Sequence, residues 1–418
     1  MPGEPSALIG YRAVDDPEGL VTPDFNWEGP SPGRSAVEAV YDLPKVRSRI
    51  DRDRLQRPHS QWDWQFLLPI TAPESIVTLR EGATPLLRNR RLGASLGLAA
   101  LYVKDESRNP TGSFKDRGAS VTASKCKESG QRGLTVASSG NLAASLAAYA
   151  AAADLEFCGF IRDDTTDTLR LQCLATGQRF FVVEGGMLEG TAIATEVSQR
   201  FGLFHAIQPY NLFRIEGKKT IAFEICQDLG WKAPDRVLIP TSGCTNVLAL
   251  FKGFSELREL GWIDTMPAID VVQPRACSPL EQAWRTRSAV QRSSGRTALL
   301  GLGHPFPAAG NRAIEIVNAT GGRCLVADDE AVYDAQREVA RCEGLSLQPA
   351  SVTPIAALKD REQQQFCREI RDQVIVWIGT GSGKNQISEP LDRCLPPPRI
   401  TGGIDEFLRL GAMARPNA

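Results

Sequence analysis

The segment 104–117 carries the residue types best suited to covalent chemistry: Lys104-Asp-Glu-Ser-Arg-Asn-Pro-Thr-Gly-Ser-Phe-Lys-Asp-Arg117. Its Asn-Pro-Thr-Gly run favours a turn, because Asn and Gly tolerate unusual backbone angles and Pro fixes φ. A strand is predicted before it, over 99–103, and a helix after it, over 115–128. Lys115 would then begin a helix, where the helix dipole disfavours a cation. A neutral lysine amine is a nucleophile that can form a Schiff base. A solvated lysine on a first helical turn is the other interpretation.

Two further loops offer anion-binding groups where helices are predicted to begin. Ser138-Ser-Gly-Asn141 combines two hydroxyls, a glycine and an amide, which suit a carboxylate. Thr241-Ser-Gly-Cys-Thr-Asn246 consists of small residues whose backbone N–H groups would face an anion. For each loop taken alone, an ordinary helix cap is the alternative.

A third loop, Gly379-Thr-Gly-Ser-Gly-Lys-Asn385, looks like a nucleotide-binding P-loop but fails its spacing. Ile378 stands where the pattern G-x-x-x-x-G-K-[ST] needs its first glycine. Asn385 follows Lys384 where the pattern needs a magnesium-binding hydroxyl. The sequence therefore does not predict a P-loop ATPase or kinase.

Short apolar strands alternate with helices through most of the chain. Further strands are predicted at 134–138, 156–161, 180–184, 236–240, 268–272 and 373–378. Further helices are predicted at 142–153, 163–175, 187–201, 246–260, 329–343 and 352–367. This alternation is typical of an α/β fold, with parallel sheets covered by helices on both faces. Ligands of such sheets bind past the carboxyl ends of the strands, where all three loops lie.

The N-terminal part of the chain shows a different pattern. Residues 1–36 are rich in Pro, Gly and acidic residues and predict an irregular extension. Residues 37–70 are expected to be helical or mixed, with Trp62, Trp64 and Phe66 docking this arm onto the body.

Composition argues against several classes of function. The 48 basic and 49 acidic residues nearly cancel, which gives no net-charge signal for nucleic acid or a membrane surface. The apolar runs fall short of the roughly twenty residues of a membrane span. The N-terminus lacks the basic and apolar regions of a secretory signal. The ten cysteines form no C-x-x-C pair and are not grouped with the three histidines, so no metal site is predicted. We expect a cytoplasmic protein without nucleic-acid or membrane partners.

Taken together, the loops require one kind of ligand. A lysine amine, an anion cradle, a carboxylate-sized pocket and a hydroxyl loop would meet at the strand ends. Pyridoxal 5'-phosphate needs such parts: a lysine for its aldehyde, a cradle for its phosphate and a polar group facing its ring nitrogen. We therefore expect this cofactor.

The chain resembles the fold-type-II pyridoxal-phosphate enzymes, and among them the threonine synthases, from about Val37 to Pro390. Besides 104–117, the resemblance rests on Glu81-Gly-Ala-Thr-Pro-Leu86, Ser138-Ser-Gly-Asn-Leu-Ala-Ala-Ser145, Phe213-Arg-Ile-Glu-Gly-Lys-Lys-Thr220, Gln348-Pro-Ala-Ser351 and Gly379-Thr-Gly-Ser-Gly383. It implies two parallel-sheet, three-layer α/β domains with the cofactor in the cleft between them, and a homodimer. The predicted parts are an arm at 1–74, a large domain at 75–120 and 208–400, a small domain at 121–207 and a tail at 401–418.

The resemblance also implies roles for single residues. Lys115 matches the Schiff-base lysine, which later acts as general base, with Phe114 beside the cofactor. Asn141 matches the partner of the ring 3-oxygen, and Thr380 matches the hydroxyl that faces the pyridine nitrogen. The residues matching the phosphate loop are Ser242, Gly243, Cys244, Thr245 and Asn246. The residues assigned to the substrate are Thr111, Ser138, Ser139, Leu142 and Arg214. The last of these matches an arginine that binds the phosphate of O-phosphohomoserine.

Several positions depart from the threonine synthase pattern. Pro209 stands in place of a phosphate-binding serine, and Leu142 replaces a threonine beside the ring asparagine. The loop 242–246 lacks its first asparagine, and Ser382 replaces a histidine. Several of these positions would line the substrate side. Our hypothesis is that the cofactor chemistry is retained and the substrate pocket is rebuilt.

The predicted function is a pyridoxal-phosphate-dependent lyase reaction in which O-phosphohomoserine and water give threonine and phosphate. One alternative is β-replacement on a phosphoserine-like substrate, as in the similar cysteate synthases. Another is β-elimination of the threonine/serine dehydratase type. A catalytically idle or regulatory homologue is a further alternative, against which the intact Lys115, Asn141 and Thr380 argue.

Overall fold

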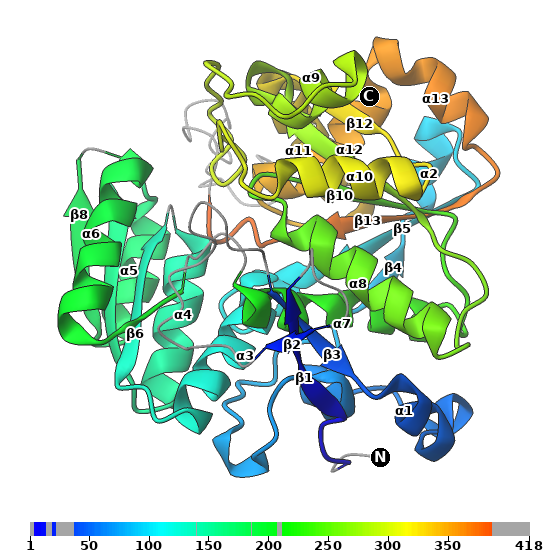
Figure 1. Ribbon diagram of the computed structural model, residues 1–418. Helices are drawn as coiled ribbons and strands as arrows, with labels where there is room; N and C mark the ends of the chain where they lie inside the picture. Colours follow the sequence, from blue (N-terminus) through cyan, green and yellow to red (C-terminus); the bar gives the residue numbers. More distant parts are fainter. Residues whose placement is uncertain are drawn as a thin grey trace, which may run out of the picture. The chain divides into compact units, whose positions relative to one another are not determined.

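A six-stranded sheet forms the centre of the computed structural model (Figure 1), which describes residues 4–13, 19–21, 37–138, 140–184, 186–206 and 211–386. Its strand order is β12-β11-β10-β13-β5-β4. The strands are β4 (Leu86–Arg88), β5 (Ala100–Asp105), β10 (Arg236–Pro240), β11 (Ala268–Pro274), β12 (Cys324–Ala327) and β13 (Val374–Gly379). All neighbouring pairs are parallel except β4 with β5.

Successive residues of these strands enter two different cores, because side chains alternate between the faces of a sheet. Val237 and Ile239 join one core with helices α7 (Leu212–Asp228), α8 (Thr245–Glu259) and α10 (Gly310–Ala319). Leu238 joins the other core with α2 (Arg90–Leu96), α11 (Asp329–Glu343) and α12 (Pro349–Lys359). Helices thus cover both faces, which confirms the predicted three-layer α/β architecture.

A second, four-stranded sheet has the order β8-β7-β6-β9, with every pair parallel. Its strands are β6 (Gly133–Ser138), β7 (Glu156–Arg162), β8 (Arg179–Val183) and β9 (Phe204–His205). Its helices are α4 (Asn141–Ala152), α5 (Asp167–Ala175) and α6 (Gly186–Phe201). Val136 of β6 packs in the core on the α4 side, and the next residue, Ala137, packs with Ala194 of α6. This sheet is therefore also covered on both faces.

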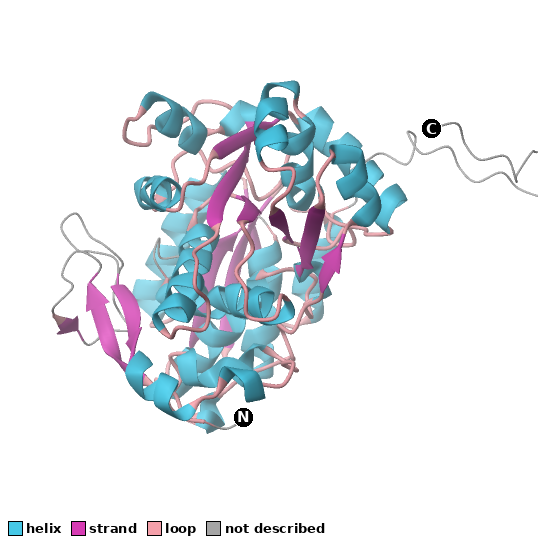
Figure 2. Cartoon of the chain, turned by 90° about the vertical axis from the view of Figure 1, so that its right-hand side faces the viewer, coloured by secondary structure: helices cyan, strands magenta, loops and turns pink. Residues whose placement is uncertain are grey.

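The N-terminal arm is more ordered than expected. Residues 1–36 were predicted to be irregular, but β1 (Leu8–Ala13) pairs antiparallel with β2 (Leu20–Val21) and β3 (Val37–Tyr41). Figure 2 shows this small sheet projecting from the body. The prediction was wrong because backbone pairing with β3 stabilises β1, and composition does not reveal such pairing. Trp62, Trp64 and Phe66 are buried in the large core, as expected for docking residues.

Several helices follow the predicted bounds, and others do not. Helix α3 (Lys115–Glu128) and helix α11 have the predicted bounds. The helix predicted over 352–367 is wrong: α12 ends at Lys359, and α13 (Gln364–Glu369) begins a separate helix. The break is at Asp360, which is extended and whose side chain accepts a hydrogen bond from the backbone N–H of Glu362.

Other short or fully buried elements were not predicted. Helix α7 buries residues on every side, so it shows no amphipathic period in the sequence. The strands β4 and β12 are only a few residues long, and helices α2, α9 (Pro279–Thr286) and α10 were also not foreseen. Helix α1 (Leu43–Arg49) lies in the segment 37–70, which was expected to be helical or mixed.

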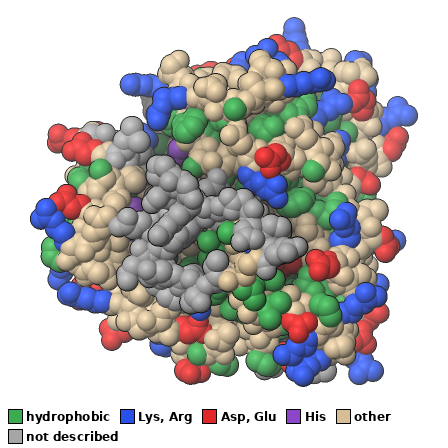
Figure 3. Space-filling model, in the orientation of Figure 1, with side chains coloured by type: hydrophobic (Ala, Val, Ile, Leu, Met, Phe, Trp, Pro, Cys, Tyr) green, Lys and Arg blue, Asp and Glu red, His purple; other side chains and the backbone are tan. Residues whose placement is uncertain are grey.

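Residues up to 386 form one compact unit by their contacts. The predicted limits between the large and small domains therefore remain a prediction, and the tail at 401–418 lies outside the described residues. On the face shown in Figure 3, basic and acidic side chains are interspersed. No helix within the described ranges is long and apolar enough to cross a membrane.

Candidate active site

Two of the three predicted loops, together with the segment that leads to Lys115, follow three adjacent strands of the large sheet, whereas the loop at 138–141 comes after β6 of the four-stranded sheet. Strands β10, β13 and β5 are neighbours and run parallel, so the segments after them leave the sheet at the same edge. These segments are 241–244 after β10, 380–386 after β13 and 106–114 after β5. The sheet topology thus brings Lys115, Thr380 and the loop 242–246 to one edge, as the sequence predicted.

The Lys115 segment is joined directly to the loop after β13. The backbone N–H of Phe114 donates to the carbonyl of Thr380 at 3.0 Å, and the N–H of Ser382 donates to the carbonyl of Gly112 at 2.8 Å. Ser113 and Gly381 form an antiparallel bridge between the same two segments. These bonds hold the start of α3 against the segment that carries Thr380.

Lys115 is partly buried at the first turn of α3. Its Nζ lies 4.2 Å from the centroid of the Phe114 ring. Burial, with a contribution from the charge of Arg214, lowers the pKa of Lys115 to about 7. A substantial fraction of this amine is therefore neutral at neutral pH, which a nucleophile or general base requires.

Helices α3 and α7 come close together beside this lysine. A Cβ added at Gly217 would lie 2.0 Å from the carbonyl oxygen of Arg117, and one added at Gly118 would lie 2.9 Å from the Cα of Arg214. Only glycine fits at such a backbone approach. The two glycines therefore allow Arg214, on the first turn of α7, to lie beside the start of α3.

The Arg214 guanidinium is buried and poorly satisfied. Arg214 is 8% exposed, and its Nε has no hydrogen-bond partner among the residues that the structure describes. Its Nη1 makes one long bond, of 3.4 Å, to the carbonyl of Ala206. Burial lowers the pKa of Arg214 to about 10. Among the described residues no carboxylate forms an ion pair with it, so its positive charge is not neutralised by a side chain described in the structure.

The predicted phosphate loop leads into helix α8. Cys244 has a positive φ of 66° immediately before the helix begins at Thr245. The side-chain amide of Asn246 donates to the carbonyl of Pro240 at 2.8 Å, which closes the loop on the end of β10. Ser242 is partly buried and Gly243 is exposed. The first backbone N–H groups of α8 are available to an anion, as at other helix N-termini.

Thr380 and Asn141 are both held by residues of the predicted motifs. The hydroxyl of Thr380 lies 2.9 Å from the hydroxyl of Ser351. The amide of Asn141 donates to Oε1 of Gln348 at 2.9 Å. Gln348 and Ser351 belong to the Gln-Pro-Ala-Ser segment, whose part in the site the sequence did not reveal. The contacts show that this segment orients both predicted cofactor residues.

The residues predicted to bind the substrate lie in different environments. Thr111 donates its N–H and its hydroxyl to Asp116, at 2.7 and 2.6 Å. Ser138 is buried, and its Oγ accepts from the N–H of Gly140 at 3.3 Å. Leu142 packs in the core of the small sheet with 6% exposure. Ser139 and Pro209 lie outside the described residues.

Two residues of the site were missed at the sequence level. Lys218 of α7 is 1% exposed and donates to the hydroxyl of Thr245 at 2.8 Å. Asn385, 2% exposed, donates to the side chain of Asn141 at 3.0 Å. The only sequence signal was their place inside the quoted segments, because neither contact follows from spacing along the chain.

A buried ion network lies beneath the site. Arg117 is fully buried and pairs with Glu106 at 2.7 Å and with Glu224 at 2.6 Å. Lys104 also pairs with Glu224, at 2.9 Å. Burial alone would raise the pKa of Glu224, but Arg117 and Lys104 hold it at about 2. These pairs connect β5, α3 and α7, and so fix the elements that carry Lys115 and Arg214.

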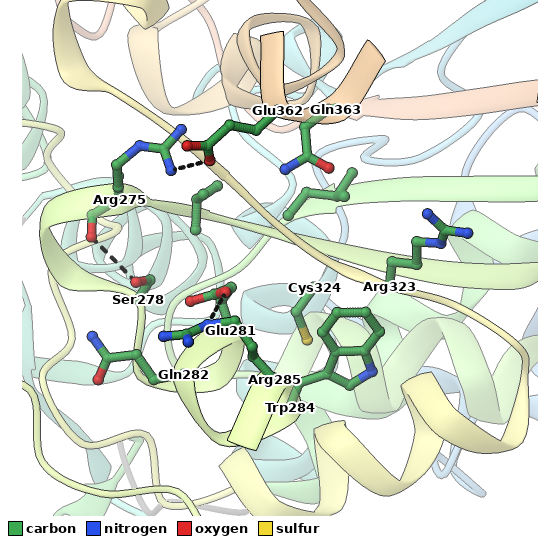
Figure 4. Close-up of a pocket in the computed structure, with 12 residues that line it drawn as sticks. Arg275, Ser278, Glu281, Gln282, Trp284, Arg285, Arg323, Cys324, Glu362 and Gln363 are labelled. Atoms are coloured by element: carbon green, nitrogen blue, oxygen red, sulfur yellow. Dashed lines mark hydrogen bonds and ion pairs between the residues drawn. The ribbon is translucent and has the colours of Figure 1, made fainter. Parts of the chain in front are cut away.

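A separate cavity of about 470 Å³ lies along β12, far in sequence from these loops (Figure 4). Within it Arg275 pairs with Glu362 at 2.9 Å and Arg285 pairs with Glu281 at 3.0 Å. None of the predicted site residues lines it. Elsewhere in the described ranges, no group of three or more His, Cys, Asp or Glu side chains is placed to hold a metal ion.

Comparison with known proteins supports the expected cofactor. The family model described as pyridoxal-phosphate dependent enzyme matches residues 77–381. The chain is 34% identical to threonine synthase of Methanocaldococcus jannaschii, over 83% of this chain and 86% of that protein. It is 30% identical to threonine synthase of Methanosarcina acetivorans, over 88% and 90%.

Solved structures show the same fold at lower identity. Maize serine racemase superposes with a TM-score of 0.64 and 19% identity, covering 79% of this chain and 93% of that one. Threonine deaminase isoform 2 of Solanum lycopersicum gives a TM-score of 0.61 at 20% identity, covering 72% and 83%.

Proposed function

We propose that this chain, which belongs to the pyridoxal-phosphate dependent enzyme family and is a pyridoxal-phosphate-dependent lyase, acts as a threonine synthase. The proposed overall reaction is O-phosphohomoserine plus water giving threonine plus phosphate. The threonine synthases that share 30–34% identity over most of the chain support it. We also expect a homodimer in the cytoplasm, and both remain predictions.

The donor set of the site fits the cofactor. The observation that tests the fit is a cluster of three cations, buried Arg214 and Lys218 and partly buried Lys115, for which the described residues supply no paired carboxylate. A phosphate group would supply the missing negative charge. The residues proposed to hold the cofactor are Lys115, Phe114, Asn141, Thr380 and the loop Ser242, Gly243, Cys244, Thr245 and Asn246. When bound, pyridoxal phosphate supplies an electron sink for the α-carbon of an amino acid.

Lys115 is proposed to move the substrate's protons. Its pKa of about 7 leaves the amine able to accept a proton from the substrate α-carbon and to return one later. Asp116, the next residue, holds Thr111 through two hydrogen bonds and thereby orients the turn that precedes the lysine.

The environment of Arg214 is the main support for the proposed substrate. Its guanidinium is buried, and within the described part of the chain its Nε has no hydrogen-bond partner and no carboxylate forms an ion pair with it. An unpaired buried cation is costly, so such a site favours an anionic ligand group. The phosphate of O-phosphohomoserine is a dianion that a guanidinium binds through two parallel hydrogen bonds. Ser138 is proposed to bind the substrate carboxylate, as is Ser139, which lies outside the described residues.

The test is phosphate release by the purified enzyme. O-phosphohomoserine should release phosphate and yield threonine in equal amounts, and O-phosphoserine should release far less. Release from O-phosphoserine alone would favour the β-replacement alternative. Formation of a keto acid and ammonia from threonine or serine would favour the dehydratase alternative.

Two variants separate the active enzyme from an idle homologue. Lys115→Ala should abolish turnover and the absorbance of the lysine-bound cofactor. Arg214→Gln should keep that absorbance and raise the KM for O-phosphohomoserine at least about tenfold, because charge-assisted hydrogen bonds to the phosphate are lost. Arg80→Gln is a matched control, since that arginine is exposed on a loop. No turnover by the parent enzyme with any of the substrates would overturn the proposal.

A further inference from the structure

Two adjacent lysines of α7 have opposite environments. Lys219 is fully buried and pairs with Glu216 at 2.6 Å and with Glu256 at 2.8 Å. Lys218 is just as buried, at 1% exposure, but no described carboxylate forms an ion pair with it. Its Nζ donates a hydrogen bond to the neutral hydroxyl of Thr245, at 2.8 Å. Lys219 therefore has a structural role, and Lys218 requires another explanation.

The surroundings of Lys218 are positive on several sides. Its Nζ lies 5.2 Å from the centroid of the same Phe114 ring that Lys115 approaches to 4.2 Å. Thr245 is the first residue of α8, a helix of 15 residues whose N-terminus carries partial positive charge. Burial, Arg214 and Lys115 together lower the pKa of Lys218 well below its ordinary value. A lysine in this place is unfavourable until an anion binds.

We propose that Lys218 binds the phosphate of the cofactor, together with the N-terminus of α8 and the hydroxyl of Thr245. Two observations point to this group rather than to the substrate. First, Lys218 contacts Thr245, the first residue of the helix that follows the proposed phosphate loop. Second, Arg214, which lies one turn earlier on α7, is already proposed to bind the phosphate of the substrate. The inference rests on the cofactor and on the proposed phosphate loop, and it does not depend on which amino acid the enzyme converts.

The test compares two forms of the cofactor on the cofactor-free protein. Pyridoxal 5'-phosphate and pyridoxal both carry the aldehyde, but only the first carries the phosphate. Each is titrated by absorbance into the parent protein and into Lys218→Met. The variant should bind pyridoxal phosphate about tenfold to a hundredfold more weakly, the loss expected for a hydrogen bond to a charged group. Its affinity for pyridoxal should be unchanged.

Matched variants separate binding from folding. Lys218→Arg keeps the charge and should retain most of the preference for the phosphorylated form. Lys127→Met removes an exposed lysine of α3 and should change neither affinity. Without cofactor, Lys218→Met should melt no lower than the parent, because it removes a buried amine that lacks a counter-ion. If Lys218→Met does not fold, Lys218→Gln and Thr245→Val allow the same comparison.

One result would overturn the inference: an unchanged ratio between the affinities for pyridoxal phosphate and pyridoxal in Lys218→Met. If that variant with cofactor bound also binds inorganic phosphate more weakly than the parent, Lys218 is assigned to the substrate's phosphate instead. Because the measurement uses no amino-acid substrate, a failure of threonine formation would not affect it.

Discussion

Asn385 donates its side-chain amide to Oδ1 of Asn141 at 3.0 Å, and so joins the loop after β13 to the helix after β6. The same amide donates to the carbonyl of Thr111 at 2.9 Å. Gln172 donates to Oδ1 of Asn385 at 3.0 Å, and the hydroxyl of Thr166 donates to its backbone carbonyl at 2.9 Å. One side chain therefore connects the Lys115 segment with two helices of the small sheet.

Asn385→Ala should weaken both the fold and the site. The partly buried partners of the amide, Asn141 and Thr111, would lose these bonds, at a cost of about 1–3 kcal/mol in the free energy of unfolding. The activity should fall because Asn141 would no longer be held in one orientation. Urea unfolding and initial rates measure the two effects. The neighbouring Lys384→Ala removes an exposed side chain and should change neither quantity. If Asn385→Ala has the stability and the initial rate of the parent, Asn385 does not have the proposed role of connecting the Lys115 segment with the small sheet.

The reaction of Lys115 with the cofactor should depend on pH near neutrality. The folded pKa of Lys115 is about 7, below the ordinary value for lysine, so the neutral amine increases as the pH rises through 7. The rate at which cofactor-free protein gains the absorbance of bound pyridoxal phosphate should therefore rise over the same range and level off above it. A rate that continues to rise to pH 10 would show that the amine is not perturbed.

Arg214→Gln should shift the rise in the rate of cofactor binding to higher pH. Burial is the main cause of the lowered pKa of Lys115, and the charge of Arg214 is the second. Removing that charge should raise the pKa of Lys115, although burial should still hold it below the ordinary value. The comparison uses the same absorbance measurement over pH 6–10 in both proteins. A downward shift in the variant would contradict the electrostatic link.

The buried network around Arg117 should be essential to stability. Arg117→Leu would leave Glu106 and Glu224 buried without that partner, at a cost of about 3–5 kcal/mol. Arg132→Leu is the matched control: its ion pair with Glu156 is exposed, so the loss should be about 1 kcal/mol or less. Urea unfolding compares the two variants, and equal losses would contradict the prediction.

The contribution of the same network to the free energy of unfolding should decrease at acid pH. The folded pKa of Glu224 is about 2, below the ordinary value for a glutamate. Its contribution to stability is therefore present above the ordinary glutamate pKa and is lost as the pH falls towards 2. In Glu224→Gln this part of the acid dependence should be absent.

Much of the fold was predictable where local patterns determine it. The strand, turn and helix order around 104–128 follows from turn residues and apolar runs, and the structure reproduces it with α3 beginning at Lys115. The position of two predicted loops and the Lys115 segment at one edge of the large sheet followed from parallel topology. The arm sheet was not predictable, because the pairing of β1 with β3 is a contact across 24 or more residues.

The missed parts of the site depend on contacts across the fold. Lys218 and Lys219 are identical and adjacent in sequence, yet one meets two carboxylates and the other meets a hydroxyl. The contacts with Glu256 and Thr245 depend on how α7 packs against α8, which no local pattern encodes. The bonds of Asn385 to Asn141 and Gln172 are likewise set by the packing of two sheets.

The arm has a consequence for any attempt to shorten this protein. Tyr41 at the end of β3 donates its hydroxyl to Glu216 at 2.7 Å, and its ring lies 4.0 Å from Nζ of Lys219. Both partners belong to α7, which also carries Arg214 and Lys218. Cutting the chain at the predicted arm boundary, residue 74, would expose this part of α7 to water. Although the arm is far from Lys115 in sequence, a truncated protein should therefore lose cofactor affinity as well as stability.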